Sequence, residues 1–107
     1  MYRLNFYVPE KNLEEVKEAL FDAGAGKIGN YEKCCWQTKG TGQFLPLKAS
    51  NPAVGEVGKT ESLIEYKVEM VCNGDKVKQV VNRLLEAHPY EEPAYDLVKI
   101  LVKKDLM

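Results

Sequence analysis

Two helical segments each lie between stretches that resemble β-strands, and this order constrains the fold more than any other feature of the chain. Residues 2–8 alternate apolar and polar side chains, which is typical of a strand with one buried face. Residues 10–23 change to a spacing of three or four between apolar positions, which predicts a helix. Pro9 before this segment and Gly24 after it are suitable helix end signals.

The second half repeats this layout. Residues 62–72 alternate again and predict a strand, and the following Asn-Gly-Asp turn can cap a helix. Residues 75–88 carry the cleanest helical periodicity in the chain, with His88 in register with the apolar stripe, and Pro89 stops the pattern. Residues 94–102 predict a final strand.

The middle of the chain is less regular. Residues 28–38 are β-like, whereas residues 39–61 hold four glycines and two prolines, which excludes a long regular element. A short strand around Phe44, Leu45 and Leu47 is one reading of this segment. Loops longer than about 12–15 residues are uncommon in compact domains and often carry function.

The predicted order is therefore β-α-β, a long loop, and β-α-β. It indicates one α+β domain over residues 1–107 with the ferredoxin-like βαββαβ fold: a four-stranded antiparallel sheet with two helices on one face.

The other face of the predicted sheet stays open. The last strand has Val98, Ile100 and Val102 on one side and Tyr95, Leu97 and Leu101 on the other, and Tyr7 and Trp36 add to the open face. Such a surface predicts burial in a homo-oligomer, a trimer or a dimer.

The composition of the chain limits the kinds of partner that it is expected to bind. A formal net charge of -1 gives no reason to expect nucleic acid or an anionic membrane, and no apolar run approaches the roughly 20 residues that span a bilayer. The start of the chain does not resemble a signal peptide, and three cysteines, two of them adjacent, make a poor disulfide framework. We therefore expect a cytoplasmic protein.

Two short motifs favour structural readings. Residues 24–29 are rich in glycine, but they follow a helix and precede a strand, which is the reverse of a phosphate-binding loop. Cys34 and Cys35 are neighbours in a β-like segment and have no histidine nearby in sequence to activate a thiol.

Residues 88–93 concentrate chemistry in one proline-stiffened turn. It contains the only histidine, His88, together with Tyr90, Glu91 and Glu92. These residues are candidate ligand-binding groups. His88, Glu91 and Glu92 are also candidate ligands for a divalent metal ion, which is the cofactor that such a set would hold. The alternative is that His88 is a packed, hydrogen-bonded residue and that the turn only leads the chain into the last strand.

Several segments, in order along the chain, resemble the YqfO-type domain of the PII/CutA-like class. They are residues 6–9, 19–26, 28–31, 34, 40–46, 51–52, 55 and 88–96. This domain occurs alone and inserted in the larger Nif3-like proteins called GTP cyclohydrolase type 2. The resemblance implies the ferredoxin-like fold, and it implies that the loop between the second and third strands contacts ligand and partner. Gly40, Gly42 and Phe44 in that loop are therefore candidate ligand contacts.

The resemblance does not imply an enzyme. The larger relatives carry a dinuclear metal site on flanking domains, supplied by several histidines, and this chain has one histidine. We therefore expect a small, non-catalytic, ligand-binding or regulatory domain that works with a protein partner and not with nucleic acid or membrane. The alternative is a divalent metal-binding protein of the CutA type. We also expect residues 88–92 to lie near residues 39–61, close to a subunit boundary.

Overall fold

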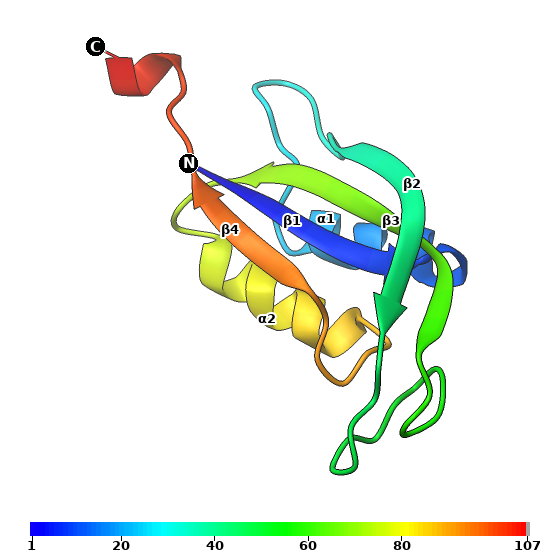
Figure 1. The fold of residues 1–107 in the computed structure, drawn as a ribbon. Helices are drawn as coiled ribbons and strands as arrows, with labels where there is room; N and C mark the ends of the chain where they lie inside the picture. The colour runs from blue at the N-terminus through cyan, green and yellow to red at the C-terminus, as the bar shows by residue number, and fades with distance from the viewer. Residues whose placement is uncertain (107) are drawn as a thin grey trace.

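In the computed structural model, which describes residues 1–106, one antiparallel sheet carries two α-helices on one of its faces (Figure 1). Along the chain the elements are β1 (Tyr2–Pro9), η1 (Glu10–Asn12), α1 (Leu13–Asp22), β2 (Trp36–Phe44), β3 (Glu61–Cys72), α2 (Val77–Ala87), β4 (Tyr95–Lys99) and η2 (Lys103–Leu106). The strands lie in the order β2-β3-β1-β4, and every neighbouring pair is antiparallel. The predicted ferredoxin-like fold is confirmed.

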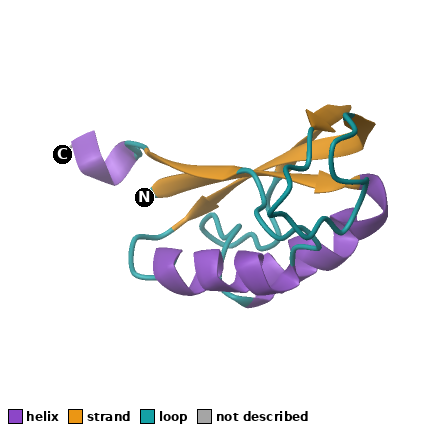
Figure 2. Ribbon diagram, turned by 60° about the horizontal axis from the view of Figure 1, so that its bottom comes forward, coloured by secondary structure: helices purple, strands orange, loops and turns teal. Residues whose placement is uncertain are grey.

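The core lies between the sheet and the helix layer (Figure 2). β1 supplies Leu4, Phe6 and Val8, which are fully buried, and their alternation in the sequence predicts this face correctly. The helices contribute a second set of buried side chains: Val16, Leu20, Val80 and Leu84. Each such side chain contributes roughly 1.5–3 kcal/mol of transfer free energy when it leaves water.

The second strand differs from its prediction. It runs over Trp36–Phe44 instead of residues 28–38, and residues 27–35 form an irregular connection held by backbone hydrogen bonds from Gly26 N–H to Val71 O and from Cys34 N–H to Gly26 O. β2 therefore contains Gly40 and Gly42, which we had assigned to a loop. The long β3 pairs with all nine residues of β2, and this pairing outweighs the weak strand propensity of glycine.

The true loop between β2 and β3 covers residues 45–60. Leu45 and Leu47 lie outside any strand, so the short strand considered for this region is wrong beyond Phe44. The loop closes on itself: Gly58 N–H donates to Pro46 O at 2.9 Å, and the Ser50 hydroxyl donates to Leu47 O at 2.7 Å. Pro46 is buried, and Gly58 adopts a φ of 82°, which favours glycine.

The last strand is shorter than predicted, since β4 ends at Lys99. Its register with β1 shows which of its two sides faces the helices. Tyr95 and Leu97 lie opposite Phe6 and Leu4, on the helix side, whereas Val98 lies opposite Arg3 on the open side. All of β4 stays exposed because it is an edge strand.

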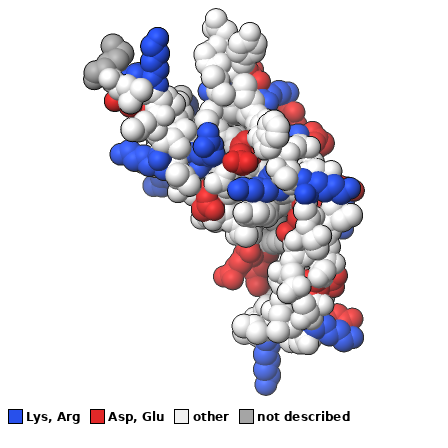
Figure 3. Space-filling view, turned by 45° about the horizontal axis from the view of Figure 1, so that its top comes forward, with Lys and Arg blue, Asp and Glu red and all other residues white. Residues whose placement is uncertain are grey.

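The surface is of mixed charge. On the face drawn in Figure 3, acidic and basic side chains are interspersed. Among residues 1–106, no helix combines the length and the apolar character that crossing a bilayer requires.

Candidate ligand-binding site

The turn after α2 is anchored by His88. This side chain is 6% exposed, and its Nε2 lies 2.6 Å from the carbonyl oxygen of Tyr7. Its Nδ1 accepts the backbone N–H of Tyr90 at 3.0 Å. A neutral imidazole whose Nδ1 accepts carries its proton on Nε2, so Nε2 donates to Tyr7. Burial lowers the pKa of His88, which keeps the ring neutral. His88 thus ties the end of α2 to β1 and sets the start of the turn.

Tyr90 projects from this turn toward the sheet. Its hydroxyl donates to Oε2 of Glu65 on β3 at 2.7 Å, and its ring packs against Phe44 with centroids 5.7 Å apart. Burial and the bond to Glu65 raise the pKa of Tyr90, so its hydroxyl stays protonated near neutral pH. Glu65 accepts this bond and retains further acceptor capacity, because a carboxylate can accept about four hydrogen bonds.

Gly42 provides the space that Glu65 occupies. A Cβ built on Gly42 would overlap the Glu65 carboxylate, whereas a Cβ on Gly40 would meet nothing within 4 Å. Gly42 therefore leaves room for a side chain of the neighbouring strand β3. A glycine in a strand interior often marks a close approach of this kind.

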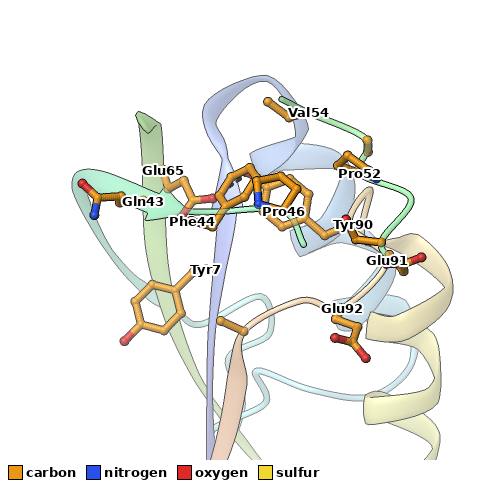
Figure 4. Close-up of a pocket in the computed structure, with 13 residues that line it drawn as sticks. Tyr7, Gln43, Phe44, Pro46, Pro52, Val54, Glu65, Tyr90, Glu91 and Glu92 are labelled. Carbon is orange, nitrogen blue, oxygen red and sulfur yellow. Dashed lines mark hydrogen bonds between the residues drawn. The ribbon is translucent and has the colours of Figure 1, made fainter. Parts of the chain in front are cut away.

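Glu65, Tyr90 and Phe44 line a cavity of about 240 Å³ under the loop of residues 45–60. Its apolar walls include Phe44, Pro46, Pro52 and Val54, and its carboxylates are Glu65, Glu91 and Glu92. Figure 4 shows Phe44, Pro46 and Tyr90 gathered with Glu65, whereas the ring of Tyr7 and the amide of Gln43 point away from this group. The loop is tied to the turn by a hydrogen bond from Asn51 N–H to Oε1 of Glu91 at 3.3 Å.

The structure brings together most of the predicted site residues. Phe44, Tyr90, Glu91 and Glu92 all line the cavity, and the expected proximity of residues 88–92 to the long loop is present in the fold. His88 lies beside Tyr90 but does not line the cavity, and neither do Gly40 and Gly42. Whether any of these residues binds a ligand stays a prediction.

Sequence reasoning missed Glu65 and the loop residues from Pro46 to Val54. In the sequence Glu65 alternates with the apolar residues Ile64 and Tyr66, so it looks like an ordinary solvent-facing strand residue. Only the position of the turn after α2, which carries Tyr90 onto the open face of β3, gives this carboxylate its role.

The three predicted metal ligands do not form a cluster. Both ring nitrogens of His88 are engaged, and Glu91 accepts a backbone N–H from the loop. In the part of the chain that the structure describes, no group of three or more His, Cys, Asp or Glu side chains is arranged to hold a metal ion. Cys34 and Cys35 lie in the irregular connection before β2, away from the cavity.

Comparison with solved structures defines the class of the fold. CutA1 from Pyrococcus horikoshii superposes with a TM-score of 0.70 at 18% identity, over 99% of this chain and 90% of that chain. The periplasmic divalent cation tolerance protein CutA from Archaeoglobus fulgidus gives a TM-score of 0.67 at 16% identity, over 97% and 90% of the two chains. At these identities the likeness concerns the fold alone. The chain has an α+β fold similar to the ferredoxin-like fold of these CutA proteins.

Sequence comparison then narrows the relationship. The GTP cyclohydrolase 1 type 2 homolog of Halalkalibacterium halodurans is 44% identical over 97 residues, which are 91% of this chain and 26% of that protein. A Bacillus cereus protein related to NIF3 has a TM-score of 0.76 at 38% identity, over 90% of this chain and 24% of that chain. No family model matches the chain.

This chain therefore matches the CutA/PII-like domain inserted in the Nif3-related GTP cyclohydrolase 1 type 2 homologs, as its motifs predict. It spans about a quarter of the length of these curated relatives.

Proposed function

We propose that this chain is a non-catalytic regulatory module that binds a small ligand in the cavity under residues 45–60 and assembles through its open sheet face. The observation that carries the proposal is the construction of the cavity. Three segments far apart in sequence meet there: the end of β2 with its loop, the start of β3 and the turn after α2. A mostly apolar cavity with a few convergent polar groups is the usual form of a small-molecule site.

The protonation states of Tyr90 and His88 support a non-catalytic role. General acid–base catalysis needs a group that exchanges its proton near the working pH. Tyr90 holds its proton because burial and Glu65 raise its pKa, and His88 is kept neutral with both nitrogens engaged. Both side chains are better suited to holding the turn in place than to transferring a proton.

The open face of the sheet supports assembly into a homo-oligomer. Trp36 on β2 is 68% exposed and Val98 on β4 is 48% exposed, and both lie on the side that the helices leave uncovered. Large apolar side chains on an uncovered sheet favour burial against a second copy, in a dimer or a trimer. A ligand site beside such an interface would allow binding to be passed on to a protein partner.

Native mass spectrometry of the chain purified from its own host tests the proposal. We expect the wild-type spectrum to show an oligomer that carries an additional small mass. Val54→Trp should abolish this mass, because Val54 lines the cavity, whereas Val57→Trp should retain it. Val57 is a matched control, since it lies in the same loop, is 48% exposed and does not line the cavity.

Two results would contradict the proposal. One is a wild-type spectrum that contains only the unliganded chain. The other is an additional mass that survives Val54→Trp unchanged, because the ligand would then be bound elsewhere.

A further inference from the structure

The charge of the cavity points to the chemical class of its ligand. The lining residues include three carboxylates, those of Glu65, Glu91 and Glu92. Among the lining residues that the structure describes, there is no lysine, arginine or histidine. Phosphate and carboxylate groups are recognised by Arg, Lys and backbone N–H groups, so this lining disfavours a nucleotide or any other anion.

The aromatic rings favour the opposite charge. Tyr90 and Phe44 pack in a tilted pair at an interplanar angle of 59°, next to the carboxylate of Glu65. Ring faces attract cations, and ionised carboxylates accept charge-assisted hydrogen bonds from ammonium groups. Because Tyr90 donates its own hydroxyl to Glu65, this carboxylate is held in place before any ligand arrives.

The basic side chains close to this site in sequence are Lys39, Lys48, Lys59 and Lys67, and none of them lines the cavity. Lys59 pairs with Glu56 at 3.1 Å in the loop, and Lys39 lies 3.7 Å from Glu10 on the helix side of the sheet. Lys67 lies opposite Tyr7 in the register of β3 and β1, outside the lining residues. The acidic character of the cavity is therefore not cancelled by an ion pair to Glu65 or Glu91.

The volume of the cavity limits the size of the ligand that it can hold. Its volume of about 240 Å³ is below the roughly 300–1,000 Å³ typical of drug-sized ligand pockets. Pro46, Pro52 and Val54 form apolar walls that would receive a hydrocarbon or aromatic body.

We infer that the cavity binds a small organic ammonium ion with an apolar body, whose charged nitrogen lies at Glu65 and whose body lies between Phe44, Tyr90 and the prolines of the loop. This inference rests on the proposed function and specifies the ligand of the same site.

The experiment is an NMR titration of the 15N-labelled chain with three separate probes at up to millimolar concentration. Phenethylamine has the predicted charge and an aromatic body, phenylacetate has a similar body with the opposite charge, and ATP represents an anionic nucleotide. We expect phenethylamine to shift amide signals of residues 44–54 and 90–94, and we expect the other two probes to leave them unchanged.

Matched variants locate the charge that matters. Glu65→Gln should weaken phenethylamine binding roughly ten-fold, because the amide keeps an acceptor for Tyr90 but loses the charge. Glu69→Gln removes the same charge four positions along β3, on the same face of the sheet but outside the cavity lining. It should leave the affinity unchanged.

The outcomes distinguish two claims: that the cavity binds a small ligand, and that this ligand is an organic ammonium ion. Shifts at the cavity with phenylacetate or ATP, and none with phenethylamine, would overturn the ligand class but leave the proposed binding function standing. Equal weakening by Glu65→Gln and Glu69→Gln would show attraction to general negative charge and overturn the site. No cavity shift with any probe, combined with a bare wild-type mass spectrum, would overturn both.

Discussion

His88 lies at the end of α2, and its place there explains why a histidine stands in an apolar register. The ring is buried like Leu84 one turn before it, yet it also connects Tyr7 and Tyr90 through its two nitrogens. Protonation would give Nδ1 a hydrogen where it now accepts one, so the charged form loses the Tyr90 bond. The residue therefore links the protonation state of one ring to the geometry of the whole turn.

This linkage predicts an acid-sensitive stability. The folded-state pKa of His88 lies below its unfolded value of about 6.5, so the unfolded chain binds more protons in this range. The free energy of unfolding should then fall as the pH drops below about 6.5, by at most roughly 1.4 kcal/mol per pH unit, until the folded-state pKa is reached. Urea unfolding at pH 7.5, 6.5 and 5.5 measures it. His88→Gln should be less stable at pH 7.5 but should lack this pH-dependent component. If the unfolding free energies of the wild type and His88→Gln change with pH in parallel, His88 is not the group responsible for the pH dependence.

Gly42 offers a second prediction at the scale of one residue. Gly42→Ala should force the Glu65 carboxylate away and break its bond to Tyr90, at a cost of about 1–3 kcal/mol in unfolding free energy. Gly40→Ala is the matched control, because its Cβ would meet open space two residues away on the same face. Chemical denaturation compares the two. Equal effects of both substitutions would mean that glycine at position 42 serves only the backbone.

At the scale of elements, α2 shows how one helix serves both the core and the site. Its apolar stripe packs on the sheet through Val80 and Leu84, and this packing places its C-terminal end beside β1. The turn that follows therefore lies beside the end of β1, at Tyr7, and the first half of β3, at Glu65. The helix register therefore decides where Tyr90 can reach.

A charge placed on either face of α2 tests this register. Leu84 is fully buried, so Leu84→Asp should cost several kcal/mol because it buries an unpaired charge. Leu85 is 46% exposed, and Leu85→Asp should change the stability by about 0.5 kcal/mol or less. Thermal melts followed by circular dichroism distinguish the two. A Leu84→Asp variant that melts like the wild type would show that the helix is rotated from its described position.

At the scale of the whole molecule, the main feature is that the two layers are unequal: the sheet has helices on only one of its faces (Figure 2). The helices cover one face of the sheet, and the long β2–β3 hairpin extends beyond them and carries the loop over the cavity (Figure 1). The principal extents of 52 × 23 × 22 Å describe an elongated unit. The helices leave the other face of its sheet uncovered (Figure 2). We propose that this face is where copies of the chain meet.

The proposed assembly predicts the behaviour of a surface variant. Val98→Asp places a charge on the open face at a side chain that is 48% exposed, so the fold should persist while the oligomer dissociates. Light scattering at micromolar concentration should show the wild type as a dimer or trimer and the variant as a 12.1 kDa monomer. Leu85→Asp, on the helix layer, should remain oligomeric. A wild-type monomer would refute the assembly.

The sequence by itself determined the fold class, because the periodicity of apolar residues is a local property. Leu4, Phe6 and Val8 on β1 and the stripe of α2 identify their buried faces without reference to any partner. The concentration of His88, Tyr90, Glu91 and Glu92 in one turn likewise predicts a candidate site there, and three of these residues line the cavity.

Only the tertiary structure decided the rest. β2 extends through Gly40 and Gly42 because a long neighbouring strand pairs with it, and pairing between distant residues leaves no local signal in a glycine-rich segment. The role of Glu65 depends on Tyr90, which is 25 positions away in sequence and 2.7 Å away in space. The faces of Tyr95 and Leu97 follow from the register with β1, since a shift of one residue in a strand exchanges its two faces. Local patterns fix which side chains are buried, whereas contacts between remote segments fix which of them meet in the cavity.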